Sequence, residues 1–173
     1  MRMRKSNLAV LALLFFWGAI LTGQKNPRPA WKEYVYADDG FVITLPNAPN
    51  RHPDTGIPDM TAYSVDLPTH SKLTLRVAHQ PRDCASILAQ LKDGALSGKD
   101  RIDVASVKDV SIDGYSGIEY QARIIPTMMT SQRFYCADGR FYTFSIGWPA
   151  NEHRSVAADR AINSFRLLKH EQK

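Results

Sequence analysis

Residues 133–148, RFYCADGRFYTFSIGW, decide the fold because they predict a β-hairpin. Two runs rich in aromatic and β-branched residues flank Asp138-Gly139, the dipeptide that most readily adopts the left-handed backbone of a tight type I′ turn. A loop made of these two residues sets the register of the hairpin. It pairs Cys136 with Phe141, Tyr135 with Tyr142, and Phe134 with Thr143.

Both faces of this hairpin are apolar. One face carries Tyr135, Tyr142, Phe144, Ile146 and Trp148, and the other carries Phe134, Cys136 and Phe141. A strand with one face in water alternates apolar and polar side chains, whereas a strand covered on both faces does not. We therefore expect the hairpin at the centre of a sheet that is covered on both sides.

Composition and charge indicate an ordinary globular protein. The chain has 173 residues, of which 44% are apolar and 23% charged, and one domain with a real core is expected. Three of the 22 basic residues precede residue 24, which leaves 19 basic against 17 acidic residues from there onward. No basic cluster with interleaved aromatic residues follows, so nucleic acid is not an expected partner.

The N-terminal residues predict export. Residues 1–7 are basic, and residues 8–21 form a run of 14 residues without a charge, shorter than the roughly 20 residues of a spanning helix. We expect residues 1–23 to be a signal peptide or an uncleaved N-terminal anchor, and residues 24–30 a linker. Gln24 stands where a lipobox has its cysteine, so no thioether lipid can form there. The domain is expected to be periplasmic or secreted, with membrane contact only through an uncleaved N-terminus.

Residues 31–168 predict a single α+β domain, followed by a polar tail at residues 169–173. The expected strands are residues 34–36, 41–45, 61–66, 73–80, 108–112, 118–125, the two strands of the hairpin, and 164–168. Asp83 is the expected N-cap of a helix to residue 97, and a second helix is expected from Pro149 and Asn151 to residue 163. Residues 46–60 hold four prolines and a glycine and predict an irregular loop. Neighbouring strands joined by short turns predict a mainly antiparallel sheet with helices packed on its faces.

No stretch of the sequence predicts catalysis or a cofactor. Ser116 lacks the following glycine of a hydrolase elbow, since Ile118 occupies that position. His79, Cys84 and Cys136 have no evident fourth partner for a metal site. The neighbouring carboxylates of Asp38 and Asp39 fall in a turn, where solvated acids are normal. We therefore predict no catalytic, cofactor-binding or metal-binding residues.

Polar strand faces offer a candidate binding patch. Strand alternation places its members, Arg76, Glu119, Gln121, Arg123 and Arg133, on polar faces. If their strands are neighbours in the sheet, the arginines share a surface that could pair with a carboxylate or phosphate group of a partner. The alternative is that Glu119 and Arg123 are ordinary solvated or cross-strand partners.

The two cysteines, Cys84 and Cys136, allow two interpretations. Both lie in the exported part, where disulfides persist, and a bridge would close a loop of about 50 residues, worth roughly 2–4 kcal/mol. The alternative is two separate buried thiols that act as small apolar side chains. We expect the disulfide.

Several motifs in this order resemble the PsbP-like α/β/α sandwich family of exported bacterial proteins. They are Trp31 with Tyr34, residues 40–46 (GFVITLP) with Pro49, residues 113–120 (DGYSGIEY), residues 139–142 (GRFY), and residues 162–167 (INSFRL). The resemblance covers about residues 31–168. It implies a non-catalytic accessory or binding module and supplies no catalytic residues. Many relatives are lipoproteins, a pattern from which Gln24 departs.

Two functions of different class follow from these observations. The first is a non-enzymatic, exported accessory or binding module of the bacterial cell envelope, whose partner is an unknown protein or envelope component. The second is an envelope hydrolase or ligand-processing enzyme with an unrecognised site. A deep pocket with convergent polar groups would favour the second, and a filled sandwich with shallow surfaces would favour the first.

Overall fold

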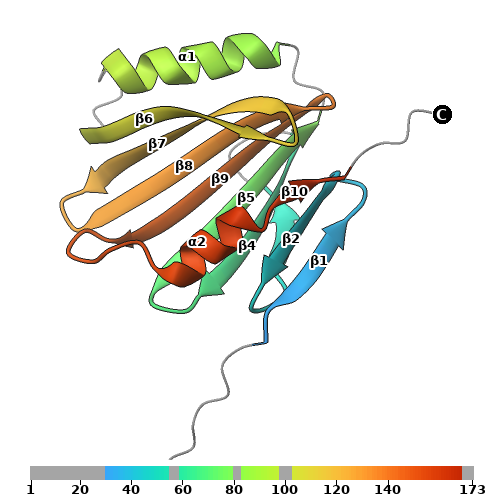
Figure 1. Ribbon diagram of the computed structural model, residues 1–173, viewed down its shortest axis with the longest axis horizontal. Coiled ribbons are helices and arrows are strands. Elements are labelled where there is room, and N and C mark those ends of the chain that lie inside the picture. Colours follow the sequence, from blue (N-terminus) through green and yellow to red (C-terminus); the bar gives the residue numbers. More distant parts are fainter. Residues whose placement is uncertain (1–29, 55–58, 80–82, 98–102, 169–173) are drawn as a thin grey trace, which may run out of the picture.

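The computed structural model describes residues 30–54, 59–79, 83–97 and 103–168 (Figure 1). The expectations for residues 1–29 and 169–173 lie outside these ranges. Along the chain the elements are β1 (Lys32–Tyr36), β2 (Phe41–Leu45), β3 (Asn50–Pro53), β4 (Met60–Leu67), β5 (Ser71–His79), α1 (Cys84–Ser97), β6 (Asp103–Ile112), β7 (Tyr115–Ile125), β8 (Met128–Ala137), β9 (Arg140–Pro149), α2 (Val156–Asn163) and β10 (Arg166–Leu167).

The described strands form two sheets, and within each sheet every pair of neighbouring strands is antiparallel. The large sheet has seven strands in the order β3-β4-β5-β9-β8-β7-β6, and the small sheet has three in the order β1-β2-β10. With two helices added, the expected mainly antiparallel α+β fold is confirmed. The division into two sheets was not predicted.

The predicted hairpin is β8 and β9, and it occupies the centre of the large sheet. Cys136 pairs with Phe141 and Tyr135 with Tyr142, in the register that the Asp138-Gly139 turn predicts. Both turn residues have positive φ angles, 48° at Asp138 and 70° at Gly139, as a type I′ turn requires. The prediction of a central hairpin with this register is therefore confirmed.

The two faces of the hairpin belong to two different apolar clusters. The larger cluster contains Tyr135, Tyr142 and Phe144 together with side chains of the small sheet and of α2. The smaller cluster contains Ile118, Phe134 and Phe141, against which side chains of α1 pack. Because successive strand residues point to opposite faces, we call these the α2 face and the α1 face of the large sheet.

Helix α1 is held on the sheet by a half-buried stripe and a covalent bond. The Asp83 side chain accepts a hydrogen bond of 2.9 Å from the Ser86 amide, which confirms the predicted N-cap. None of the residues of α1 is fully buried, and Ile87, Leu88 and Leu91 only partly cover the apolar strands. A disulfide joins Cys84 to Cys136 with a Cα–Cα distance of 5.8 Å. The preferred interpretation of the two cysteines is thus confirmed.

Three local predictions were wrong. The loop expected over residues 46–60 contains β3, whose Pro53 is tolerated because β3 lies at an edge of the sheet and pairs only with β4. The second helix begins at Val156 rather than near Pro149, with Ser155 as its N-cap. The last strand is limited to Arg166–Leu167, because Ser164 still caps α2.

Candidate functional site

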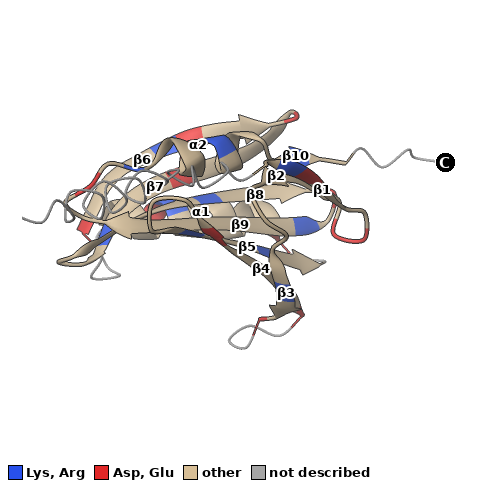
Figure 2. Cartoon of the chain, turned by 90° about the horizontal axis from the view of Figure 1, so that it is seen from below, with Lys and Arg blue, Asp and Glu red and all other residues tan. Residues whose placement is uncertain are grey.

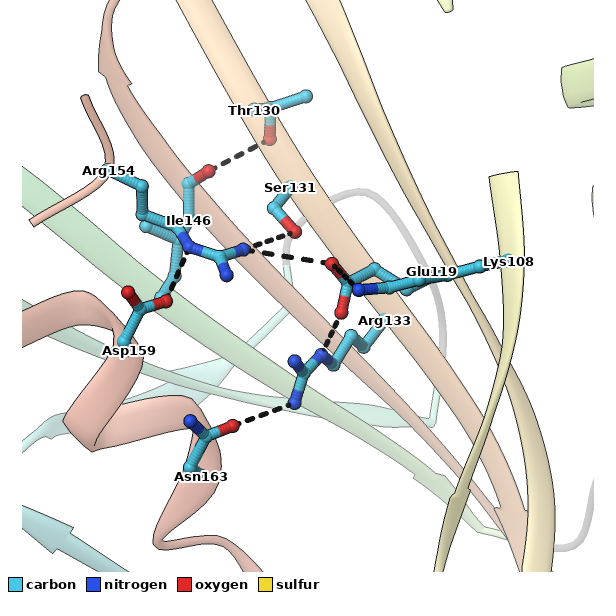
Figure 3. A network of polar contacts seen from close by, with 9 residues as sticks. All are labelled: Lys108, Glu119, Thr130, Ser131, Arg133, Ile146, Arg154, Asp159 and Asn163. Atoms are coloured by element: carbon cyan, nitrogen blue, oxygen red, sulfur yellow. Dashed lines mark hydrogen bonds and ion pairs between the residues drawn. The ribbon is translucent and has the colours of Figure 1, made fainter. Parts of the chain in front are cut away.

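The α2 face of the large sheet holds a buried carboxylate surrounded by cations (Figure 3). Glu119 of β7 is only 1% exposed, and the guanidinium of Arg133, its direct neighbour on β8, donates a hydrogen bond to Oε2. The other oxygen, Oε1, lies 3.2 Å from Lys108 Nζ of β6 and 3.7 Å from a nitrogen of Arg154. Three cations thus compensate one buried negative charge.

The same network ties α2 to the sheet (Figure 3). Arg154 lies in the segment before α2 and donates to Ser131 Oγ at 3.1 Å, while its Nε lies 2.6 Å from Asp159 of α2. Arg133 donates to Asn163, at the end of α2, at 3.4 Å. The charges of this network are therefore engaged in holding elements together.

Opposing effects act on the Glu119 carboxyl. Burial by itself would raise the pKa of Glu119, but the hydrogen bonds and charges of Arg133 and Lys108 outweigh burial and lower the pKa below its ordinary value. Glu119 is thus held as a carboxylate. A carboxyl group that acts as a general acid would need a raised pKa instead.

A second buried carboxylate, Asp39, lies in the turn between β1 and β2. It is 2% exposed, which overturns the expectation of a solvated turn acid. Its side chain accepts a hydrogen bond from the Tyr63 hydroxyl, lies 2.8 Å from His79 Nε2, and lies 3.5 Å from a nitrogen of Arg51. Asp39 therefore connects the small sheet to β3, β4 and β5 of the large sheet.

The tyrosines around Asp39 are held in their neutral form. Burial and the hydrogen bond to Asp39 raise the pKa of Tyr63 well above its usual range. Burial raises the pKa of Tyr142 to about 12, and its hydroxyl donates to the Asp39 carbonyl at 2.9 Å. Both hydroxyls are hydrogen-bond donors to Asp39, so neither is poised as a nucleophile.

A shallow hollow lies beside Asp39. Its volume is about 190 Å³, and its walls are Val35, Tyr36, Ala37, Asp38, Asp39, Arg51 and Tyr63. Pockets for small molecules usually measure about 300–1,000 Å³. The hollow has room for a side chain of a partner, not for a drug-sized molecule.

The structure divides the predicted binding patch. Glu119, Gln121, Arg123 and Arg133 lie on the α2 face of β7 and β8. Arg76 lies on the α1 face of β5, because its neighbours Leu75 and Val77 belong to the α2-face cluster, and it pairs with Asp54 at 2.6 Å. Strands β9 and β8 separate β5 from β7. Arg76 is therefore not part of a common surface with the other four residues.

Sequence reasoning missed several residues of these networks. Lys108 had a usable signal, since it stands opposite Glu119 once β6 and β7 pair. Arg154 and His79 had none, because their contacts join segments that are far apart in the chain. The described residues contain no cluster of three potential metal ligands. They also contain no helix of the length and apolarity that crossing a membrane requires.

Comparisons with known proteins identify the fold. No family model matches the chain, and no curated protein matches it significantly. The solution structure of cyanobacterial PsbP (CyanoP) from Synechocystis sp. PCC 6803 matches with a TM-score of 0.56 at 15% identity, over 80% of this chain and 93% of that chain. A protein of Bacteroides thetaiotaomicron matches with a TM-score of 0.51 at 14% identity, over 82% of this chain but only 50% of that chain. The chain has the PsbP-like fold, as its resemblance to that family predicted.

Proposed function

We propose that this protein is an exported accessory module that binds a protein or another component of the bacterial cell envelope and catalyses no reaction of its own. The observation that carries the proposal is the PsbP-like fold, which extends over most of the chain. We also propose the α/β/α layering of that family, since α1 packs with the Phe134 cluster and α2 with the Tyr135 cluster.

The arrangement of charges supports a binding module over an enzyme. Both buried carboxylates, Glu119 and Asp39, are engaged by cations or hydroxyls of neighbouring strands. Networks in which cations and hydroxyls compensate a buried carboxylate stabilise a structure, although Glu119 Oε1 is met by ion pairs and not by a hydrogen bond. A catalytic acid or base needs a partner that it can exchange with substrate. Lysine, arginine and acidic residues are interspersed over the domain (Figure 2), which favours a specific contact over general attraction to a polyanion.

Export is supported by sequence and disulfide together. The basic residues 1–7 and the apolar residues 8–21 are typical of a signal peptide. The Cys84–Cys136 disulfide belongs to the oxidising compartments, because cytosolic thiols are normally kept reduced. The two observations are independent and agree.

The contact surface that we propose is the β6–β7 surface, which consists of Lys108, Gln121 and Arg123. The Lys108 side chain is 55% exposed although it forms an ion pair with Glu119. Arg123 is exposed on the same face of the sheet. An arginine and a lysine with an amide between them can bind a carboxylate or phosphate group. Arg76, on the opposite face, offers a matched control.

A quantitative pull-down from the native envelope tests the proposal. The bait is the full chain tagged after Lys173, cross-linked in cells and compared with the Arg123→Ala and Arg76→Ala variants. We expect a component whose recovery falls several-fold with Arg123→Ala and is unchanged with Arg76→Ala. Equal recovery with all three baits, each shown to be folded by thermal melting, would contradict this contact surface.

A second candidate function rests on the Asp39–His79 pair. A carboxylate 2.8 Å from a half-exposed imidazole, close to a hollow of about 190 Å³, is an arrangement that hydrolases use to orient a base. Such an envelope hydrolase or ligand-processing enzyme would act on a panel of ester, phosphoester and glycoside substrates and would lose that activity with His79→Ala. If the protein is an accessory module, neither the wild type nor the His79→Ala variant would be active on any of these substrates.

A further inference from the structure

Four of the five large apolar side chains that are exposed in the described residues lie at one end of the domain, and the fifth, Val35, lines the hollow beside Asp39. Ile124 and Ile125, at the end of β7, are each 53% exposed. Val156, the first residue of α2, is 85% exposed, and Leu96, near the end of α1, is 66% exposed. Isolated exposed apolar residues are common, but these four come from three elements that end or begin towards the same end of the large sheet, with α1 and α2 on its two faces (Figure 1).

The strand register and the course of the two helices place these four residues at the same end of the large sheet. Ile125 at the end of β7 pairs with Met128 at the start of β8, and Met128 pairs with Pro149 at the end of β9. From there the chain continues to Val156. Helix α1 starts at the opposite end, where Cys84 is bonded to Cys136 close to the Asp138-Gly139 turn. It runs from there towards the end of the sheet at which β6 begins (Figure 1). We call Leu96, Ile124, Ile125 and Val156 the apolar end.

The N-terminal segment joins the domain at this end. Trp31 precedes β1, and its ring centroid lies 4.4 Å from the Arg160 guanidinium carbon of α2. Val156 is one helical turn before Arg160, on the same side of α2. Residues 22–30 connect Trp31 to the uncharged run of residues 8–21, and nine residues reach at most about 30 Å when fully extended.

We propose that the apolar end docks on a lipid bilayer, with the β7–β8 turn inserted among the acyl chains. Residues 124–129, IIPTMM, contain no charged side chain. A protein partner needs a contiguous, complementary patch of about 800 Å², whereas a fluid apolar phase accommodates side chains on separate elements. An uncleaved N-terminus that stays in the membrane would hold this end towards the bilayer. The inference rests on export but does not depend on the identity of the partner.

The charges at this end bear on whether docking needs anionic lipids. Arg123 stands opposite Asp103 across β6 and β7, and Lys72 stands opposite Asp66 across β4 and β5. In each of these two register pairs a cation therefore stands opposite an acid. Docking should depend on apolar burial and should be as strong on zwitterionic lipids as on anionic ones.

Photo-crosslinking of the full chain in the bacterial envelope tests the proposal. A photoreactive amino acid is placed at position 125 and, as a control, at position 116, an exposed position at the other end of the same strand. We expect lipid adducts at position 125 and none at position 116. Equal lipid labelling at both positions, no lipid adduct at 125, or a protein adduct in place of lipid at 125 would overturn the inference.

A second measurement removes the apolar turn. The probe is moved to position 156, and Ile124→Ser with Ile125→Ser is compared with the conservative pair Ile124→Val with Ile125→Val. We expect the lipid adduct at position 156 to fall several-fold in the serine variant and to persist in the valine variant, and an unchanged adduct in the serine variant would also overturn the inference. If the otherwise unsubstituted chain gives no lipid adduct at position 125 but is still exported and still recovers its partner, this inference alone is refuted, because neither test of the proposed function uses these residues.

Discussion

The Asp39 carboxylate lies 2.8 Å from His79 Nε2, and this contact joins the turn of the small sheet to the end of β5 in the large sheet. Together with Tyr63 and Arg51 it makes Asp39 a junction between the two sheets. A buried carboxylate is stable only when such partners replace its hydration.

We therefore expect Asp39→Asn to lower the free energy of unfolding by about 2 kcal/mol, because a buried charge-assisted contact is lost. Asp38→Asn is the matched control. Asp38 is the preceding residue of the same turn and is exposed, so its substitution should change stability by less than about 0.5 kcal/mol. Urea denaturation of the two variants checks this prediction. Equal stability of both variants would show that Asp39 does not hold the sheets together.

The Glu119 network predicts a particular dependence of stability on pH. Because the pKa of Glu119 is lowered from 4.5 in the folded protein, the unfolded chain binds this proton more strongly. The stabilising contribution is fully present above pH 4.5 and is lost as the pH falls below 4.5 through the lowered pKa. Glu119→Gln should cost about 3 kcal/mol at pH 7, and its deficit should shrink progressively below pH 4.5.

Denaturation of wild type and Glu119→Gln at several pH values between 3 and 7 measures this difference. The control is Lys92→Ala, which removes the exposed ion pair with Asp109 and should cost less than about 1 kcal/mol. A deficit for Glu119→Gln that stays constant from pH 7 to pH 3 would contradict the assigned role of this carboxylate.

The disulfide is expected to hold α1 on the sheet. Helix α1 has no fully buried residue, so its noncovalent attachment is weak. The double variant Cys84→Ala, Cys136→Ala should lose about 2–4 kcal/mol of stability. Hydrogen exchange should show the amides of α1 exchanging much faster, while those of β8 and β9 stay protected. Unchanged protection of α1 would show that its apolar stripe suffices.

The packing of β7 on β8 predicts that Gly117 cannot be replaced. A Cβ atom there would overlap the Phe134 carbonyl oxygen, which is backbone, and the Tyr135 ring. Gly117→Ala should therefore cost about 3 kcal/mol or more. Gly147→Ala is the control, because its added Cβ would make only ordinary contacts, with the Met128 methyl at 3.5 Å and the Met129 carbonyl oxygen at 3.8 Å. Thermal melting compares the two variants, and similar midpoints would refute the argument.

Features that depend on neighbouring residues were predictable, and features that depend on distant ones were not. The β8–β9 register follows from Asp138-Gly139 and strand alternation, both of which are local. The small sheet depends on β10 pairing with β2, with Leu167 opposite Phe41, and no local pattern specifies such a contact. The irregular loop was inferred from prolines, but Pro53 does not disrupt a strand at the edge of a sheet.

The candidate site shows the same division. Alternation placed Glu119, Gln121 and Arg123 on one face correctly, because they belong to one strand. It could not place Arg76 relative to them, since that requires the order of strands and the face on which Arg76 lies. Burial of Asp39 was likewise not visible in the sequence, because it results from side chains of β3, β4 and β5 that reach the turn.

Export is the claim on which the proposed function, the disulfide and the membrane-facing end all depend. Alkaline phosphatase fused after Lys173 measures it directly, because this reporter becomes active only in an oxidising compartment outside the cytoplasm. We predict an active fusion for the full chain and an inactive one when residues 2–23 are deleted. An intact but inactive full-length fusion would contradict the account.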